Sequence, residues 1–106
     1  MNARAVMPID AAFVPKLARK ARLKRDRHAN KMLILYPERG LELNEAAAAI
    51  AQKLDGTRSI AVIVEELARE LLVTPHSEER ALRERIERDV VAFVGFLRDK
   101  GLLEPP

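Results

Sequence analysis

Apolar and polar residues alternate in the first part of the chain, which is the pattern of half-buried strands. The alternation of apolar and basic residues over Leu17–Leu23 predicts a first strand. The polar stretch Asp26–Asn30 predicts a turn, and the continuous apolar run Met32–Tyr36 predicts a strand covered on both sides. Pro37–Gly40 is typical of a hairpin loop, and Leu41–Leu43 alternates again as a short third strand. Together these segments predict an antiparallel meander with the third strand at one edge.

From Asn44 onward, the apolar residues recur at the spacing of helices instead of alternating. Asn44 is a suitable N-cap for an Ala-rich helix over Glu45–Leu54, and Gly56 follows as its stop signal. Ser59 caps a second helix, which runs to about Leu72. The expected core stripe of this second helix consists of Ile60, Ile63, Val64, Leu67 and Leu71.

A third and longer helix follows the connector Val73–Ser77. It starts at Ser77, and Gly101 stops it because glycine accepts the left-handed conformation that ends many helices. Leu102 and Leu103 then cover the base of the helices. The expected core stripe of this third helix consists of Leu82, Ile86, Val90, Phe93 and Leu97.

Three strands followed by three helices predict an α+β fold, in which an antiparallel sheet is segregated from its helices. We expect the helices and the small sheet to pack much as in a winged-helix domain. A chain of 106 residues forms one small domain with a single core. We assign residues 1–14 to a flexible N-terminal arm and residues 15–106 to the folded domain.

The composition excludes several classes of function. The chain has no Cys, and His28 and His76 are far apart in predicted turns, so neither thiolate chemistry nor a metal site is expected. It has no Gly-rich phosphate loop, and adjacent acidic residues on a helix do not face each other. We therefore expect no catalytic residues, no metal and no cofactor, so the chain is not predicted to be an enzyme. The longest apolar run, Ala46–Ala51, is too short for a membrane span, and we expect a cytoplasmic protein.

Charge is distributed unevenly along the sequence. The formal net charge is +3, but residues 1–43 carry +6 and residues 44–106 carry −3. Eight of the basic residues fall between Lys16 and Lys31. Such a cluster is typical of a solvated strand edge, and it can also attract nucleic acid or an acidic peptide.

A DNA-binding winged helix is therefore one alternative, in which the basic cluster and four arginines of the third helix would contact the phosphates of DNA. Those arginines are Arg80, Arg83, Arg85 and Arg88. Against this alternative, the same helix carries Glu84, Glu87 and Asp89, which phosphate would repel. A plain structural or dimerisation module is a further alternative.

The third helix is more apolar than a helix with one buried face requires. At 100° per residue, Val91 and Val94 lie well outside a stripe centred near Phe93. These valines are covered by another element, line a groove for a partner, meet a second subunit in a homodimer, or are exposed by chance. The sequence alone leaves these alternatives open.

Several stretches follow one another in an order that is found in one family. A basic strand, Leu17–Arg25, precedes Leu-Ile-Leu-Tyr-Pro-Glu at 33–38 and Gly-Leu-Glu-Leu-Asn at 40–44. The Ala-rich helix, Asp55-Gly56, Ser59-Ile60 and the final Gly101-Leu102-Leu103 continue the pattern. Over Leu17 to Glu104 the chain resembles the PqqD family, accessory proteins of pyrroloquinoline quinone biosynthesis.

The resemblance implies a non-catalytic peptide chaperone, the archetype of recognition elements for ribosomally made and modified peptides. Members bind the precursor peptide PqqA by strand addition and present it to the radical S-adenosylmethionine enzyme PqqE, which joins a Glu and a Tyr of the peptide. Nucleic acid and membrane are not among the partners that the resemblance implies.

In the family, the peptide lies between the third strand and the third helix. Transferred to this sequence, the implied peptide-binding residues are Leu41, Glu42, Leu43, Val90, Val91, Val94 and Arg98. We expect Val94→Asp to weaken peptide binding and to leave the fold nearly unchanged. The segment Val73–Arg85 is longer and more charged than is usual in the family, which puts the start of the third helix in question.

Overall fold

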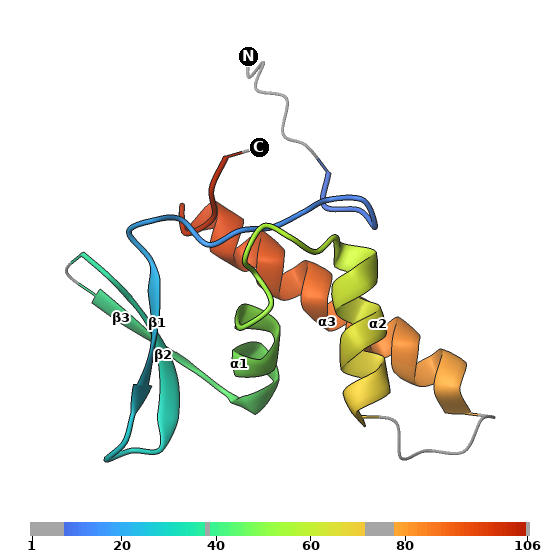
Figure 1. The fold of residues 1–106 in the computed structure, drawn as a ribbon, viewed down its shortest axis with the longest axis horizontal. Coiled ribbons are helices and arrows are strands. Elements are labelled where there is room, and N and C mark those ends of the chain that lie inside the picture. Colours follow the sequence, from blue (N-terminus) through green and yellow to red (C-terminus); the bar gives the residue numbers. More distant parts are fainter. Residues whose placement is uncertain (1–7, 38, 72–77, 106) are drawn as a thin grey trace.

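A three-stranded sheet forms one end of the molecule and three helices pack beside it in the computed structural model (Figure 1). The structure describes residues 8–37, 39–71 and 78–105. The strands are β1 (Arg22–Asp26), β2 (Lys31–Tyr36) and β3 (Arg39–Leu43), and the helices are α1 (Glu45–Ala51), α2 (Ile60–Leu71) and α3 (Glu79–Asp99). The predicted α+β order of strands and helices is confirmed.

The sheet is an antiparallel meander with the order β1-β2-β3, so β2 is central and β3 is an edge. Ile34 of β2 is paired with Leu23 on one side and Leu41 on the other, and its side chain is completely buried. Because side chains alternate across a strand, this row marks the face that packs on the helices. The opposite face carries half-buried Leu33 and Leu35.

The turn between β1 and β2 follows the chemistry expected of its polar residues. The Asp26 carboxylate accepts hydrogen bonds from the backbone N–H groups of His28 and Ala29, at 3.0 and 3.3 Å. Asn30 adopts a positive φ of 55°, a conformation that asparagine tolerates better than most residues. The predicted turn over Asp26–Asn30 is therefore confirmed.

The first strand begins later than the alternation predicted, at Arg22 instead of Leu17. Leu17 pairs with Leu103 in an isolated bridge, and Lys16 pairs with Asp55 in another. The backbone of this segment is thus hydrogen-bonded to the α1–α2 connection and to the C-terminal tail. An apolar alternation identifies an extended segment but not the strand with which it pairs.

Residues 8–14, which the sequence assigns to a flexible arm, pack on the helices. The carbonyl groups of Ala11 and Phe13 accept hydrogen bonds from the N–H groups of Ala61 and Ile60, at 3.0 and 2.8 Å. These are donors of the first turn of α2, which have no partner inside the helix. Ile9 and Phe13 are partly buried against the core. The remainder of the predicted arm, residues 1–7, lies outside the described residues.

Helix α1 starts as predicted and ends earlier. The Asn44 side chain accepts a hydrogen bond from the Ala47 N–H at 2.8 Å, which caps the helix. Helical structure ends at Ala51 rather than Leu54, and Leu54 is buried in the connection to α2. Gly56 follows with a φ of +83°, where a side chain would also meet the Lys16 stem.

The core stripe of α3 is rotated relative to the predicted one. Ile86, Val90, Val94 and Leu97 are buried, whereas Phe93 is only half-buried. The centre of the stripe therefore lies close to Val90, about 60° from the expected centre at Phe93. The residues 73–77 of the predicted connector lie outside the described residues.

The end of α3 is as predicted. Gly101 has a φ of +74° and turns the chain back. Leu102 is completely buried and Leu103 nearly so, which confirms that they cover the base of the helices.

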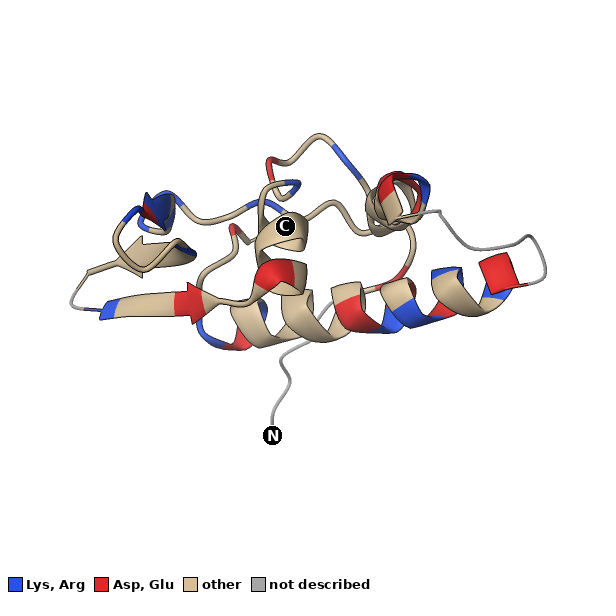
Figure 2. Cartoon of the chain, turned by 90° about the horizontal axis from the view of Figure 1, so that it is seen from below, with Lys and Arg blue, Asp and Glu red and all other residues tan. Residues whose placement is uncertain are grey.

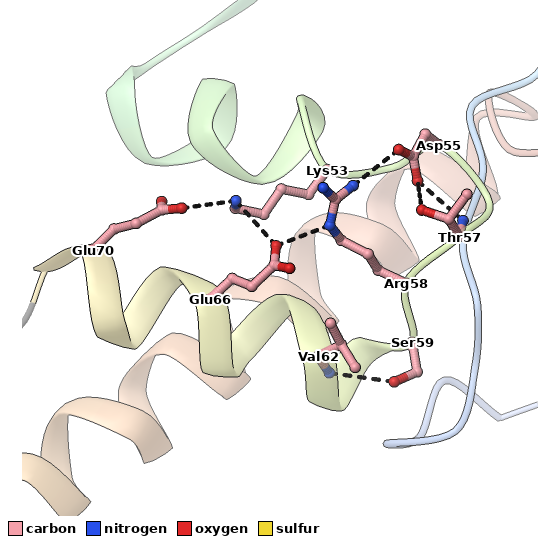
Figure 3. Close-up of polar contacts among 8 residues, drawn as sticks. All are labelled: Lys53, Asp55, Thr57, Arg58, Ser59, Val62, Glu66 and Glu70. Atoms are coloured by element: carbon pink, nitrogen blue, oxygen red, sulfur yellow. Dashed lines mark hydrogen bonds and ion pairs between the residues drawn. The ribbon is translucent and has the colours of Figure 1, made fainter.

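An ion-pair network ties the α1–α2 connection to α2 (Figure 3). The Lys53 ammonium lies 2.9 Å from the Glu70 carboxylate and 3.2 Å from that of Glu66. Arg58 bridges Glu66 and Asp55, at 2.8 and 2.9 Å. The hydrogen bond with Glu70 raises the pKa of Lys53, and the hydrogen bond from Lys53 lowers the pKa of Glu66.

We expect Glu66→Gln to lower the melting temperature slightly at pH 7. We also expect the melting temperature of this variant to fall less than that of the wild type as the pH is lowered. Because the Glu66 pKa is lowered by folding, its contribution is complete above the ordinary value of 4.5 and is lost as the pH falls through the lower folded value. Thermal unfolding between pH 7 and pH 3 measures the difference from the wild type, and Glu87→Gln on α3 is the control. Equal acid dependence of Glu66→Gln and wild type would contradict this assignment.

Candidate functional site

The strand β3 presents one free edge. In the described part of the chain, β2 is the only strand that pairs with β3, so the outer edge of β3 has no neighbouring strand. Leu43 is buried and Leu41 is half-buried on the core face, while Glu42 points to the other face and pairs with Lys31 at 3.2 Å. The leucines thus hold β3 on the core, and the outer backbone N–H and C=O groups remain able to pair with an extended chain.

Helix α3 runs along the same side of the molecule as β3, with β1 and α2 on the opposite side (Figure 2). On this side α3 carries four residues at helical spacing, Asp89, Ala92, Phe93 and Phe96, which we call the open flank of α3. Phe96 is 42% exposed, and the Lys100 ammonium lies 5.1 Å from the centre of its ring. The open flank is therefore an accessible and partly aromatic surface.

A groove separates the open flank of α3 from the start of α1. Its volume is about 380 Å³. Because Asn44 directly follows β3, the groove begins where the free strand edge ends. Its lining residues are Asn44, Ala46, Ala47 and Ile50 from the β3–α1 side, and Asp89, Ala92 and Phe93 from α3.

The α3 residues singled out from the sequence do not line this groove. Val90 and Val94 are both 0% exposed and belong to the core, so the expectation that Val94 lies outside the core stripe is wrong. Val91 and Arg98 lie on the flank of the core stripe opposite Phe96. Ile9, from the N-terminal segment, lies against Gly95 on that flank. Its Cδ1 atom is 3.7 Å from the position that a Cβ on Gly95 would occupy.

The open flank supplies Asp89, Ala92 and Phe93 to the groove, whereas Val90 and Val94 lie in the core. The assignment of Val91 and Arg98 to the peptide site stays a prediction. Sequence reasoning missed the open flank because it centred the core stripe on Phe93 and so placed Val94 outside. The i, i+3 spacing of Phe93 and Phe96 fits a buried stripe as well as an exposed flank, so this spacing alone could not have identified the open flank.

The basic residues of β1 lie apart from the edge strand β3. Arg22, Lys24 and Arg25 belong to β1, which β2 separates from β3, whereas β3 begins with Arg39 and has Glu42 near its end, so it carries both signs of charge (Figure 2). The basic residues of β1 therefore do not border the free edge of β3.

The described residues contain no group of three or more His, Cys, Asp or Glu side chains that could hold a metal ion. No helix in the described part of the chain combines the length and the apolar character that crossing a membrane requires.

The sequence matches the family described as "Coenzyme PQQ synthesis protein D (PqqD)" over residues 31–103, which contain β2, β3 and all three helices. The chain belongs to the PqqD family. A PqqA binding protein of Xanthomonas oryzae pv. oryzae is 40% identical over 89 residues, covering 84% of this chain and 88% of the relative. A PqqA binding protein of Rhodopseudomonas palustris is 43% identical over 89 residues, covering 84% and 79%.

Two solved PqqD structures have similar folds. The solution structure of the PqqD truncation of Methylobacterium extorquens PqqCD has a TM-score of 0.69 and 29% identity, covering 90% of this chain and 97% of that one. It is described as a functional, stand-alone recognition element for ribosomally synthesised and post-translationally modified peptides. The crystal structure of PqqD from Xanthomonas campestris has a TM-score of 0.53 and 35% identity, covering 86% and 92%.

We expect Val94→Ala to destabilise this PqqD-family chain by about 2 kcal/mol, because it removes two buried methyl groups from the core. Phe96→Ala removes a larger side chain from an exposed position and should cost about 1 kcal/mol or less. Urea unfolding of both variants measures the difference. A larger loss for Phe96→Ala than for Val94→Ala would contradict the position of the core stripe on α3.

Proposed function

We propose that this chain is a non-catalytic PqqA-binding protein that adds the peptide as an extra strand to β3. Two kinds of finding support this proposal. Curated relatives at 40 and 43% identity are PqqA binding proteins, and a PqqD domain of similar fold is a peptide recognition element. The single structural observation that carries the proposal is the free edge of β3, which ends directly before Asn44, where the groove along the open flank of α3 begins.

Backbone pairing alone is too weak to hold a peptide on β3. Three or four strand hydrogen bonds at about 1 kcal/mol each contribute about 3–4 kcal/mol. A micromolar complex needs about 8 kcal/mol, before the entropy of association is included. Apolar side chains of the peptide must therefore be buried as well, and each adds about 1.5–3 kcal/mol.

The open flank of α3 supplies this apolar contact. Phe96 is exposed and Phe93 is half-buried, so peptide side chains that lie against them remove aromatic surface from water. Within Leu41–Leu43, the backbone N–H and C=O groups that point away from β2 pair with the peptide. Val90 and Val94 act only by packing, because they hold α3 in position from inside the core.

We further propose that the bound peptide is presented in the cytoplasm to the radical S-adenosylmethionine enzyme PqqE, which joins a Glu and a Tyr of PqqA. A peptide held as an edge strand is extended, and alternate side chains point to opposite faces. One face is held against the domain while the other remains accessible to an enzyme.

We expect N-methylation of single PqqA backbone amides to test the strand addition directly. A methyl group removes one donor and leaves the side chain unchanged, and in a strand only alternate amides point to the partner. Within the bound segment, affinity should fall about tenfold at every second residue and change little at the residues between. Isothermal titration with a synthetic PqqA series measures this, and a loss without alternation would contradict strand addition.

We expect Ala92→Lys to weaken PqqA binding at least tenfold, because it places a long charged side chain on the open flank of α3. Ala81→Lys is the matched control, since Ala81 is an exposed alanine on the same helix but lies near its start. Backbone NMR titration should show shifts at β3 and the open flank, and PqqE turnover of PqqA should fall with Ala92→Lys only. Equal effects of both lysines would refute this site.

A further inference from the structure

The groove beside β3 continues into a second pocket between the three helices. This pocket has a volume of about 80 Å³. It shares Ala46, Ile50 and Asp89 with the groove, so the two form one continuous surface. Its other lining residues are Ala49, Leu67, Leu71 and Ile86.

The pocket exists because α1 has alanines where it faces α2 and α3. Ala46 and Ala49 have the smallest side chains that still favour a helix, and they leave space that a leucine would fill. At the mouth of the pocket, Leu71 is 55% exposed although it belongs to the apolar stripe of α2. Apart from Asp89, every lining residue is apolar.

We propose that this pocket receives an aliphatic side chain of the peptide that binds β3. The proposal rests on the proposed function and adds to it, because a peptide leaving the end of β3 passes over Asn44 into the groove and reaches the pocket. The volume is about half of the roughly 150 Å³ that accommodates a benzene ring. The pocket therefore favours a residue the size of valine or leucine over an aromatic one.

Asp89 favours a basic residue in the peptide next to this aliphatic anchor. It is the only charged residue that lines either the groove or the pocket, and it lies where the two meet. It makes no ion pair with any described residue, although Arg85 and Arg88 are on the same helix. A lysine or arginine of the peptide beside the aliphatic anchor would form an ion pair with the Asp89 carboxylate.

The experiment measures the affinity of the full chain for synthetic PqqA and for a scan of PqqA in which each residue in turn is alanine. Ala49→Leu fills the pocket, and Ala81→Leu is its control on an exposed helical surface. Asp89→Asn removes the charge, and Glu87→Gln is its control on the same helix. Thermal unfolding of each variant establishes that it is folded.

We expect Ala49→Leu to weaken PqqA binding about tenfold, and Asp89→Asn about threefold to tenfold at low salt. In the scan, alanine at one aliphatic position of PqqA should weaken binding to the wild type but have little further effect on binding to Ala49→Leu. Alanine at one basic position should likewise weaken binding to the wild type but not to Asp89→Asn. If Ala49→Leu does not fold, Leu71→Asp at the mouth of the pocket takes its place, and we expect this variant to bind PqqA more weakly than the wild type.

Wild-type affinity in both Ala49→Leu and Asp89→Asn, with PqqA still bound, would overturn the pocket proposal and leave the proposed function intact. Absence of PqqA binding to the wild-type chain would instead refute the proposed function itself.

Discussion

Burial of one stripe of α3 determines how the other parts of the molecule are arranged. Val90, Val94 and Leu97 are completely buried, so the rotation of the helix about its axis is set by packing in the core. That rotation directs one flank of α3 toward the start of α1 and the other toward the N-terminal segment. Because the helix is held in this orientation, Phe93 lines the groove that begins at Asn44, directly after β3.

The N-terminal segment and the α1–α2 connection stabilise the position of α2, which packs on α3. The carbonyl groups of Ala11 and Phe13 complete the first turn of α2, and the ion pairs of Lys53 and Arg58 fasten the α1–α2 connection to the same helix. Because α2 packs on α3, these contacts stabilise the surface on which α3 rests. Side chains near the groove can then remain short or exposed without loss of the fold.

Most of the fold was predictable from local patterns, because local signals decide where the strands and helices lie. The Asn44 cap, the Gly101 stop and the order of the six elements needed no tertiary information. The pairing of Leu17 with Leu103 and the packing of residues 8–14 were not predictable, since these contacts join distant parts of the chain. Part of the candidate site was predictable: β3 was identified as an edge strand, but the α3 stripe is rotated by about 60° from the predicted one, which buries Val94 and leaves Phe96 exposed.

The pairing of Leu17 with Leu103 bears on how the domain folds during synthesis. Ala18 also bonds to Leu102, and the Glu104 N–H donates to the Lys16 carbonyl, so the beginning and the end of the domain close on each other. Closing a long loop before its contacts form is entropically costly and slows folding. On the ribosome, the sheet and helices can form as they emerge, but the domain closes only after its final leucines have left the exit tunnel.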